Sequence, residues 1–245
     1  MNIIKLNAID STNSYLKELA VKSVIESYTV VVAEHQIAGR GQMGTSWVSD
    51  NGKNLTFSVL INLESYKVQY QFYLSMAVSL AVLNSVKMNV KIPIAIKWPN
   101  DILAEKDKLA GILIENVLSG NFIKQSIIGI GLNVNQVFLA DSLVKATSLK
   151  MISGIKFDRD KLLNELISSI SYYVGYIERN ELKKIKKMYL NSLYQYNKPT
   201  MFEDKNGIIF LGKIIDVFED GKLVVECENE TTRKFNLKEI KFASR

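Results

Sequence analysis

The segment 97–114, KWPNDILAEKDKLAGILI, alternates short apolar runs with clusters of polar residues. Short apolar runs bounded by turn-forming residues are typical of buried strands, so we expect strands over 94–98 and 109–117. Pro99 ends the first strand, because a proline restricts the residue before it and has no amide hydrogen to donate. The segment therefore predicts two strands, with a polar turn after the first.

Five residues of this segment could carry chemistry. Lys97, Asn100 and Asp101 place a cation, an amide and a carboxylate around the proline turn. Asp101 could hold Mg²⁺, which prefers a few carboxylates together with substrate phosphates, or its side chain could cap the turn. Lys108 could offer a point charge to a carboxylate or phosphate at a pocket mouth, or could be a surface lysine beside a strand. Gly111 within a strand suggests the close approach of a ligand or of another backbone.

Outward from this segment, hydrophobic periodicity predicts a large region in which helices and strands mix. Runs rich in β-branched residues predict strands, and apolar residues at helical spacing predict helices. A cluster of helix-capping residues at 10–13 should begin the first helix. The further strands are expected at 28–33, 55–61 and 123–134, and the further helices at 70–86, 158–177 and 181–193.

The pattern of predicted secondary structure changes after Pro199. Short strands alternate with Asn-Gly and Asp-Gly turns, which predicts a small β-barrel over residues 197–245 beside a main domain of residues 1–196. A barrel of that size has a marginal core, so it would be stabilised by docking on the main domain. Cys227 is the only cysteine, so no intrachain disulfide can form, and we expect it at a buried strand position rather than as a nucleophile.

Composition narrows the class of protein. Thirty-one Lys and Arg against 25 Asp and Glu give a net charge of +6, which could favour a nucleotide, a nucleic acid or an acidic partner, or could reflect a Lys-rich solvated surface. Residues 1–10 lack a basic region followed by an apolar stretch, and charges interrupt the longest apolar segments. We therefore expect no signal peptide, no membrane span and a cytoplasmic location.

A glycine-rich segment, GRGQMG at 39–44, precedes Trp47. Such loops let backbone amides point inward to bind an anion, and Arg40 adds a fork of donors for phosphate or carboxylate. Trp47 offers a flat face for a purine. A mobile hairpin loop with a buried tryptophan would give the same pattern. The segment is neither a Walker loop, since no Gly-Lys-Ser/Thr follows, nor a Rossmann fingerprint, since a strand follows it.

The segment GIGLNVN at 129–135 combines small residues with two amides. Asn133 and Asn135 are two residues apart in a strand, so their side chains point to the same side. They could face a ligand, or they could satisfy backbone groups at the strand end.

Taken together, the order and spacing of these segments resemble the biotin protein ligases. The resemblance rests on DSTN at 10–13, EHQIAGRG at 34–41, KWPND at 97–101, KLAGILIE at 108–115 and GLNVN at 131–135. It covers nearly the whole chain. It implies an α/β (α+β) fold, in which a mixed β-sheet is backed by helices and a small SH3-like β-barrel lies at the C-terminus.

The resemblance also implies a reaction and its participants. ATP and Mg²⁺ would activate biotin to biotinyl-5'-AMP, and biotin would pass to a lysine of the biotin carboxyl carrier domain of a carboxylase. Lys108, beside the biotin carboxylate, and Arg40 would be the catalytic residues. The implied biotin contacts are Ser11, Thr12, Asn13, Gln36, Gly39, Arg40, Gly41, Gln42, Lys108 and Gly111; the implied ATP contacts are Arg40, Trp47, Lys97, Asn100 and Asn133; and Asp101 would lie near Mg²⁺.

Two features depart from the family pattern. Relatives often carry arginines where this chain has Gln42 and Met43, so two fewer cations would lie near the adenylate. The helix-turn-helix of the repressor-type relatives has no room before Ile9, so we expect no direct DNA binding. The sequence leaves a monomer and a homodimer both open. His35 is expected to pack rather than to take part in catalysis.

Two other classes of function are alternatives, and the first of them, the lipoate ligases, shares the catalytic fold. A lipoate-type ligase would lack the pairing of the Gly-Arg-Gly loop with KWPND. A non-catalytic biotin sensor or a nucleic-acid-binding module would be marked by loss of the charge of Arg40 or Lys108. The sequence retains all of these features, which favours the ligase.

Overall fold

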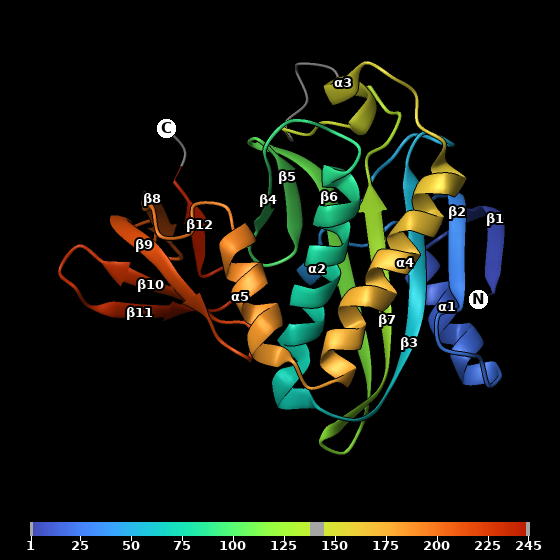
Figure 1. Cartoon of the computed structure of the whole chain (residues 1–245), viewed down its shortest axis with the longest axis horizontal. Helices are drawn as coiled ribbons and strands as arrows, with labels where there is room; N and C mark the ends of the chain where they lie inside the picture. Colours follow the sequence, from blue (N-terminus) through green and yellow to red (C-terminus); the bar gives the residue numbers. More distant parts are fainter. Residues whose placement is uncertain (1, 138–144, 244–245) are drawn as a thin grey trace.

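Seven strands form a large sheet in the order β1-β2-β3-β7-β6-β5-β4 (Figure 1). In this computed structural model, which describes residues 2–137 and 145–243, β1 runs parallel to β2 and the other neighbours are antiparallel. The predicted mixed sheet is thus confirmed. Its strands are β1 (Ile3–Ile9), β2 (Val30–Gln36), β3 (Leu55–Lys67), β4 (Ile94–Lys97), β5 (Asp101–Ala104), β6 (Asp107–Ser119) and β7 (Phe122–Leu132).

Helices cover both faces of this sheet, because successive side chains of its buried strands point to opposite sides. On one face α2, α4 and α5 pack over alternate strand residues such as Val30 to build the main core (Figure 1). On the other face, Leu16 of α1 forms a small separate cluster with Val31, Leu60 and Ile127. The helices are α1 (Thr12–Lys22), α2 (Gln71–Lys87), α3 (Leu149–Ser153), α4 (Arg159–Glu178) and α5 (Leu182–Ser192), with the 3₁₀ turns η1 (Gln42–Gly44) and η2 (Val68–Tyr70).

Short polar side chains fix where two of these helices begin. Ser11 caps α1 by accepting a hydrogen bond from the Ser14 amide, as the capping cluster in the sequence predicts. Asp158 caps α4, where its Oδ1 accepts from the amides of Asp160 and Lys161 at 2.9 and 3.1 Å. The cap at Ser11 matters most for the site, because it sets the first turn of α1.

The C-terminal strands form a second, antiparallel sheet in the order β11-β10-β9-β8-β12. β11 and β12 lie at its two edges, so the sheet is not closed into the predicted barrel. Its core is also not separate, because Phe202, Ile214 and Leu223 belong to the same hydrophobic cluster as the large sheet. These strands are β8 (Pro199–Asp204), β9 (Ile209–Val217), β10 (Leu223–Cys227), β11 (Thr232–Phe235) and β12 (Ile240–Phe242).

Two strands, β1 and β5, are not predicted by the apolar runs of the sequence. β1 is an edge strand with no fully buried residue, so it lacks the apolar run that marks a buried strand. β5 has four residues and follows Asn100 directly, so a tight hairpin forms where the sequence suggests only a turn. Cys227 ends β10 and is half-buried rather than buried. Within the described residues, no helix is long and apolar enough to cross a membrane.

Asp204 organises the turn after β8. Its Oδ1 accepts from the amides of Asn206 and Ile208 at 3.0 and 3.2 Å, and its Oδ2 accepts from the Arg233 guanidinium at 2.9 Å. The hydrogen bond from Arg233 is the main reason that the pKa of Asp204 lies below its ordinary value of 3.8. The guanidinium also lies over the ring of Phe210, so this carboxylate connects three strands of the second sheet.

Replacement of this carboxylate, Asp204→Asn, should lower the Tm at pH 7, because a neutral amide carries no charge that could form an ion pair with Arg233. A carboxylate with a depressed folded-state pKa stabilises the fold above its ordinary pKa, and that contribution is lost as the pH falls through the folded-state value. The difference in Tm should therefore narrow as the pH falls below 3.8. Thermal unfolding at a series of pH values measures it, and a difference that is constant with pH would contradict the assignment. Asp220→Asn is the control, since its pair with Lys222 is exposed and should contribute less.

Candidate functional site

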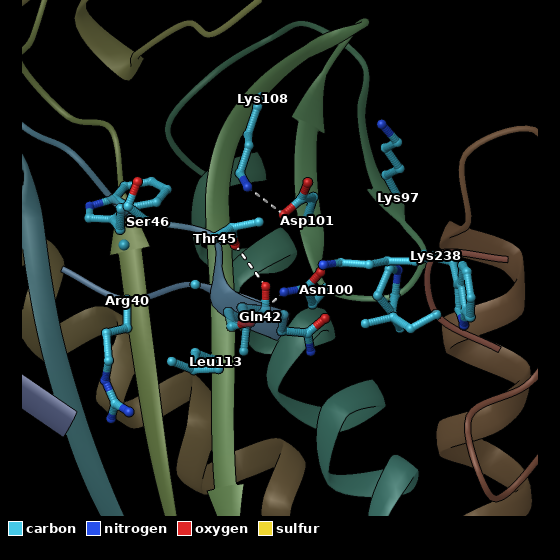
Figure 2. Close-up of a pocket in the computed structure, with 18 of the residues that line it drawn as sticks. Arg40, Gln42, Thr45, Ser46, Lys97, Asn100, Asp101, Lys108, Leu113 and Lys238 are labelled. Atoms are coloured by element: carbon cyan, nitrogen blue, oxygen red, sulfur yellow. Dashed lines mark hydrogen bonds and ion pairs between the residues drawn. The ribbon is translucent and has the colours of Figure 1, made fainter. Parts of the chain in front are cut away.

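A cavity of about 630 Å³ lies between the large sheet, the glycine-rich loop (residues 39–46) and the C-terminal sheet (Figure 2). Its lining comes from the start of α1, the end of β2, the turn between β4 and β5, and strands β6 and β7. Most of the predicted site residues meet here. Those that line the cavity are Ser11, Thr12, Asn13, Gln36, Arg40, Gly41, Gln42, Trp47, Lys97, Asn100, Asp101, Lys108 and Gly111.

Three glycines form the floor of the cavity, and each lies beneath a side chain of the site. Gly111 of β6 and Gly131 of β7 are register partners, and Gly129 is two residues away on the same face of β7. A Cβ atom would stand 2.4 Å from Asn13 Oδ1 at Gly129, and 2.3 Å from an indole carbon of Trp47 at Gly131. At Gly111 it would stand 3.3 Å from the Lys108 Nζ and 3.4 Å from Trp47. The close approach predicted at Gly111 is therefore made by side chains of the chain itself.

A buried polar cradle surrounds the first turn of α1. The amide and the hydroxyl of Thr12 both donate to Gln36 Oε1, at 2.8 and 3.0 Å. The Ser58 hydroxyl lies 2.7 Å from Thr12 Oγ1 and 2.5 Å from Asn13 Oδ1. Ser58 belongs to none of the motifs, although a serine inside an apolar strand is itself a signal of a polar contact in the core. These contacts fix the side chains before any ligand arrives.

Arg40 points to this cradle rather than to Lys108 (Figure 2). Its guanidinium donates to Glu115 Oε2 at 2.7 Å, and Asn13 Nδ2 donates to the same oxygen at 2.8 Å. Glu115 is the last residue of the KLAGILIE motif, but its place within a strand does not by itself indicate a role in the site. It links the glycine-rich loop to the first turn of α1.

Lys108 and Asp101, which carry opposite charges and are predicted to bind different groups, lie in contact. Lys108 Nζ is 2.7 Å from Asp101 Oδ1, and both side chains are partly exposed to the cavity (Figure 2). The Lys108 ammonium also lies 5.8 Å from the centre of the Trp47 ring. In the described ranges 2–137 and 145–243, no three His, Cys, Asp or Glu side chains gather to hold a metal ion. A metal at Asp101 would therefore take its other ligands from water, from substrate phosphates or from amide and carbonyl oxygens.

The turn that carries these polar groups is fixed from two sides. Asn100 Nδ2 donates to the Ile112 carbonyl at 2.6 Å, and the Ile112 amide donates to the Asn100 carbonyl at 3.0 Å. Trp98 Nε1 donates to the Gly221 carbonyl at 2.9 Å. The turn is therefore tied to β6 and to the C-terminal sheet, which places Lys97 at the cavity wall.

The C-terminal module is expected from its sequence to help in docking ATP or the acceptor, but none of its residues is predicted to line the site. That part of the chain has only strand alternation and turn residues, and neither pattern indicates which distant segment a strand will face. Three of its lysines nevertheless reach the cavity. The lining residues from this region are Phe202, Glu203, Asp204, Lys205, Gly207, Ile214, Leu223, Leu237, Lys238, Ile240, Lys241 and Phe242.

Two predicted site residues, Gly39 and Asn133, are not among those that line the cavity. Gly39 has a conformational role, because a Cβ atom there would stand 2.3 Å from the Trp47 carbonyl oxygen. Asn133 is buried and its Nδ2 lies 3.4 Å from the Lys108 carbonyl oxygen. Asn135 binds the amide and the carbonyl of Phe157 at 2.9 and 3.0 Å. The two amides could face a ligand or satisfy backbone groups. In this structure both of them contact backbone groups.

Residues 6–133 match the sequence profile of the biotin/lipoate A/B protein ligase family. The chain belongs to this family. The profile covers the cradle, the glycine-rich loop, the turn after β4 and all three floor glycines. The resemblance to biotin protein ligases drawn from the five motifs is therefore confirmed.

Similar members of the family include both enzymes and solved structures. The bifunctional ligase/repressor BirA of Bacillus spizizenii is 30% identical over 230 residues, which are 93% of this chain and 70% of that protein. The biotin–[acetyl-CoA-carboxylase] ligase of Mycobacterium tuberculosis is 36% identical over 163 residues, 65% of this chain and 59% of that protein. The structure of the biotin protein ligase from Aquifex aeolicus in complex with biotin and ATP superposes with a TM-score of 0.81 at 27% identity, over 99% of both chains.

A methyl group added to the cavity floor, Gly131→Ala, should displace the Trp47 indole. The added Cβ would stand 2.3 Å from a ring carbon, and a rigid ring cannot give way without moving as a whole. The indole would then meet more water, so tryptophan emission should shift to longer wavelength and acrylamide should quench it more. The other tryptophan, Trp98, is tied to the C-terminal sheet and should report no change.

The control combines Gly131→Ala with Trp47→Phe, which should abolish the shift. If the emission of the single variant matched that of the wild type, the indole would not rest on this glycine.

Proposed function

We propose that this chain is a biotin protein ligase, which activates biotin with ATP to biotinyl-5'-AMP and transfers biotin to a lysine of a carrier protein. One observation carries the proposal: the glycine floor lies beneath the cradle at Asn13 and beneath the Lys108 ammonium. Biotin matches that strip, because it joins a hydrogen-bonding ureido ring to an apolar chain that ends in a carboxylate. The family membership and the named relatives support the same reaction.

The ureido ring would be held by the cradle. Ser11, Thr12, Asn13 and Gln36 supply donors and acceptors there, and their mutual hydrogen bonds reduce the entropy lost when a ligand binds. The apolar chain would lie between Asn13 and Lys108, beside the Trp47 indole that rests on the glycine floor. The loop residues Gly39, Gly41 and Gln42 would then close over the bound ligand.

In the first step, a carboxylate oxygen of biotin would attack the α-phosphorus of ATP. The new oxygen–phosphorus bond forms as the bond to pyrophosphate breaks, which leaves biotinyl-5'-AMP. Both reactants are anions, so cations must offset their repulsion and stabilise the charge on the transferring group. Lys108 and Lys97 would serve here, and Arg40 would act from the loop.

ATP would use groups on the other side of Lys108. Trp47 would give its indole to the purine, and Asn100 would hold polar groups of the nucleotide. Asn133 does not line the cavity, so it would act from behind, through its contact with the Lys108 backbone. Mg²⁺ would arrive with the phosphates, and a single carboxylate such as Asp101 suits an ion that takes most of its ligands from substrate and water. Lys108 beside Asp101 would keep the metal-bound phosphates close to the biotin carboxylate.

In the second step, the neutral amine of a carrier lysine would attack the acyl carbon, and AMP would leave as the amide forms. This step needs orientation and the exclusion of water, because water also attacks a mixed anhydride. The glycine-rich loop would provide both. Since Glu115 links Arg40 to Asn13, binding at the cradle would help to hold the loop. We propose a biotin carboxyl carrier domain of a carboxylase as the acceptor, and the cytoplasm as the compartment.

The direct test is incubation of the protein with biotin, ATP, Mg²⁺ and a biotin carboxyl carrier domain, followed by intact-mass spectrometry. One biotinyl group should appear on the carrier, and only when ATP is present. A carrier whose acceptor lysine is replaced by arginine is the control. Transfer of lipoate but not biotin would assign the chain to the lipoate ligases of the same family, and no pyrophosphate release with either acid would exclude a ligase.

Removal of the ammonium, Lys108→Ala, should slow pyrophosphate release by about 10²–10³, since a lost charge contact in the transition state costs roughly 2–4 kcal/mol. The fold should persist, because the ion pair with Asp101 is partly exposed and such pairs add little stability. Lys106→Ala is the matched control, as this lysine is exposed on the preceding turn. An unchanged rate for Lys108→Ala would show that this charge does not act on the reaction.

A further inference from the structure

The glycine-rich loop is a small hairpin whose tip has its own conformation. The Trp47 amide donates to the Gly39 carbonyl at 2.9 Å and the Gly41 amide to the Thr45 carbonyl at 2.6 Å, which closes the hairpin. At the tip, Met43 has φ 49° and ψ 45°, a left-handed conformation that costs a residue with a side chain conformational energy. The Met43 side chain is exposed, so packing does not hold the tip in place.

A lysine of the C-terminal sheet contacts this tip. Lys238 Nζ donates to the Met43 carbonyl at 2.9 Å, across a separation of 195 residues. Lys238 lies in the turn between β11 and β12 and also has a positive φ, of 64°. Figure 2 shows its side chain reaching from the C-terminal sheet toward the loop beside Gln42 and Asn100. The hydrogen bond therefore joins the side chain of one residue with a positive φ to the backbone carbonyl of another.

Lys238 differs from the other two lysines of the C-terminal region that line the cavity. Lys241 is paired with Glu203 at 2.9 Å, and Lys205 lies 3.8 Å from Glu239. Within residues 2–137 and 145–243, Lys238 has no carboxylate partner, and its contact is the loop carbonyl. An ammonium has three donors, so two remain for water or for a ligand in the cavity that Lys238 lines.

The loop has little else to hold its tip. Arg40 is the only charged residue among residues 39–46, and its guanidinium binds Glu115 at the base of the hairpin rather than at the tip. Gln42 and Met43 bring no charge of their own. Opening of the loop away from the cavity must therefore break the Lys238–Met43 hydrogen bond.

We propose that Lys238 is a positioning residue, which holds the glycine-rich loop against the cavity from the C-terminal sheet. The loop would close over the activated intermediate, so Lys238 would set how long that intermediate stays bound. The second statement rests on the proposed function, whereas the first concerns the protein without ligands. A cation from a distant part of the chain would thus hold the loop closed, a role that charged residues within the loop could also serve.

The first test measures hydrogen–deuterium exchange of the peptide that spans the loop in the ligand-free protein. Lys238→Met should raise the exchange rate of the loop amides roughly fivefold, the usual effect of losing one net hydrogen bond. Lys238→Arg should restore slow exchange, because a guanidinium can also donate to a carbonyl. Lys234→Met is the matched control, since Lys234 lies on β11 against Phe218 and away from the cavity lining.

Lys238→Gly separates this role from an effect on folding. Glycine adopts a positive φ without strain, so this variant should have a Tm equal to or above that of the wild type. It should nevertheless exchange the loop amides as fast as Lys238→Met. Slow exchange in both the Gly and the Met variants would overturn the proposal.

The second test measures the release of biotinyl-5'-AMP after its formation in the absence of a carrier. Release should be roughly fivefold faster from Lys238→Met and Lys238→Gly than from the wild type and Lys238→Arg. If loop exchange changed but release did not, Lys238 would position the loop without retaining the intermediate, and that half of the proposal would be wrong. If the wild type formed no intermediate, the proposed function would fail, and the exchange experiment would still test the loop contact.

Discussion

The register between β6 and β7 is the constraint on which the site depends. It sets Gly111 opposite Gly131 and leaves a floor without side chains, on which Trp47 rests and above which Lys108 extends. A slip of one residue would turn the glycines to the other face of the sheet and place Ile112 or Ile130 under the indole. The long antiparallel pairing of β7 with both β3 and β6 makes such a slip costly, so the most extensive ladder of the fold also fixes the site.

Much of the site could be predicted because its segments carry local signatures. The residues of DSTN, the glycine-rich loop, KWPND and KLAGIL do line one cavity, since each motif places polar groups at a helix start, a loop or a strand end. Pairings across the fold could not be predicted in this way. Glu115 stands in a recognisable motif, but only the folded chain brings Arg40 and Asn13 to the same carboxylate oxygen. Lys238 stands in no motif, and its contact depends on how the second sheet docks.

In the fold as well, features set by neighbouring residues could be predicted, and features set by pairing between distant segments could not. Strands with buried apolar runs, such as β2, β3 and β7, could be predicted from their residues alone. β1 could not, because an edge strand buries few side chains, and its parallel partner β2 is separated from it by α1. Short strands that alternate with turns, together with the family resemblance, predict a closed C-terminal barrel. Closure depends on pairing between the two edge strands, which the sequence does not encode locally.

The small cluster beneath α1 has a consequence for heat resistance. The cradle residues Thr12 and Asn13 belong to α1, whose apolar contacts are made by Leu16 and a few neighbours. The main core, in contrast, extends through both sheets. A region with few buried contacts opens at lower free energy than the body of a protein. On warming, this corner would melt first and the ligand pocket would lose its shape while the sheets were still intact. An engineer who wants a catalyst that survives higher temperatures should therefore enlarge the contacts under the first helix rather than repack the dense interior.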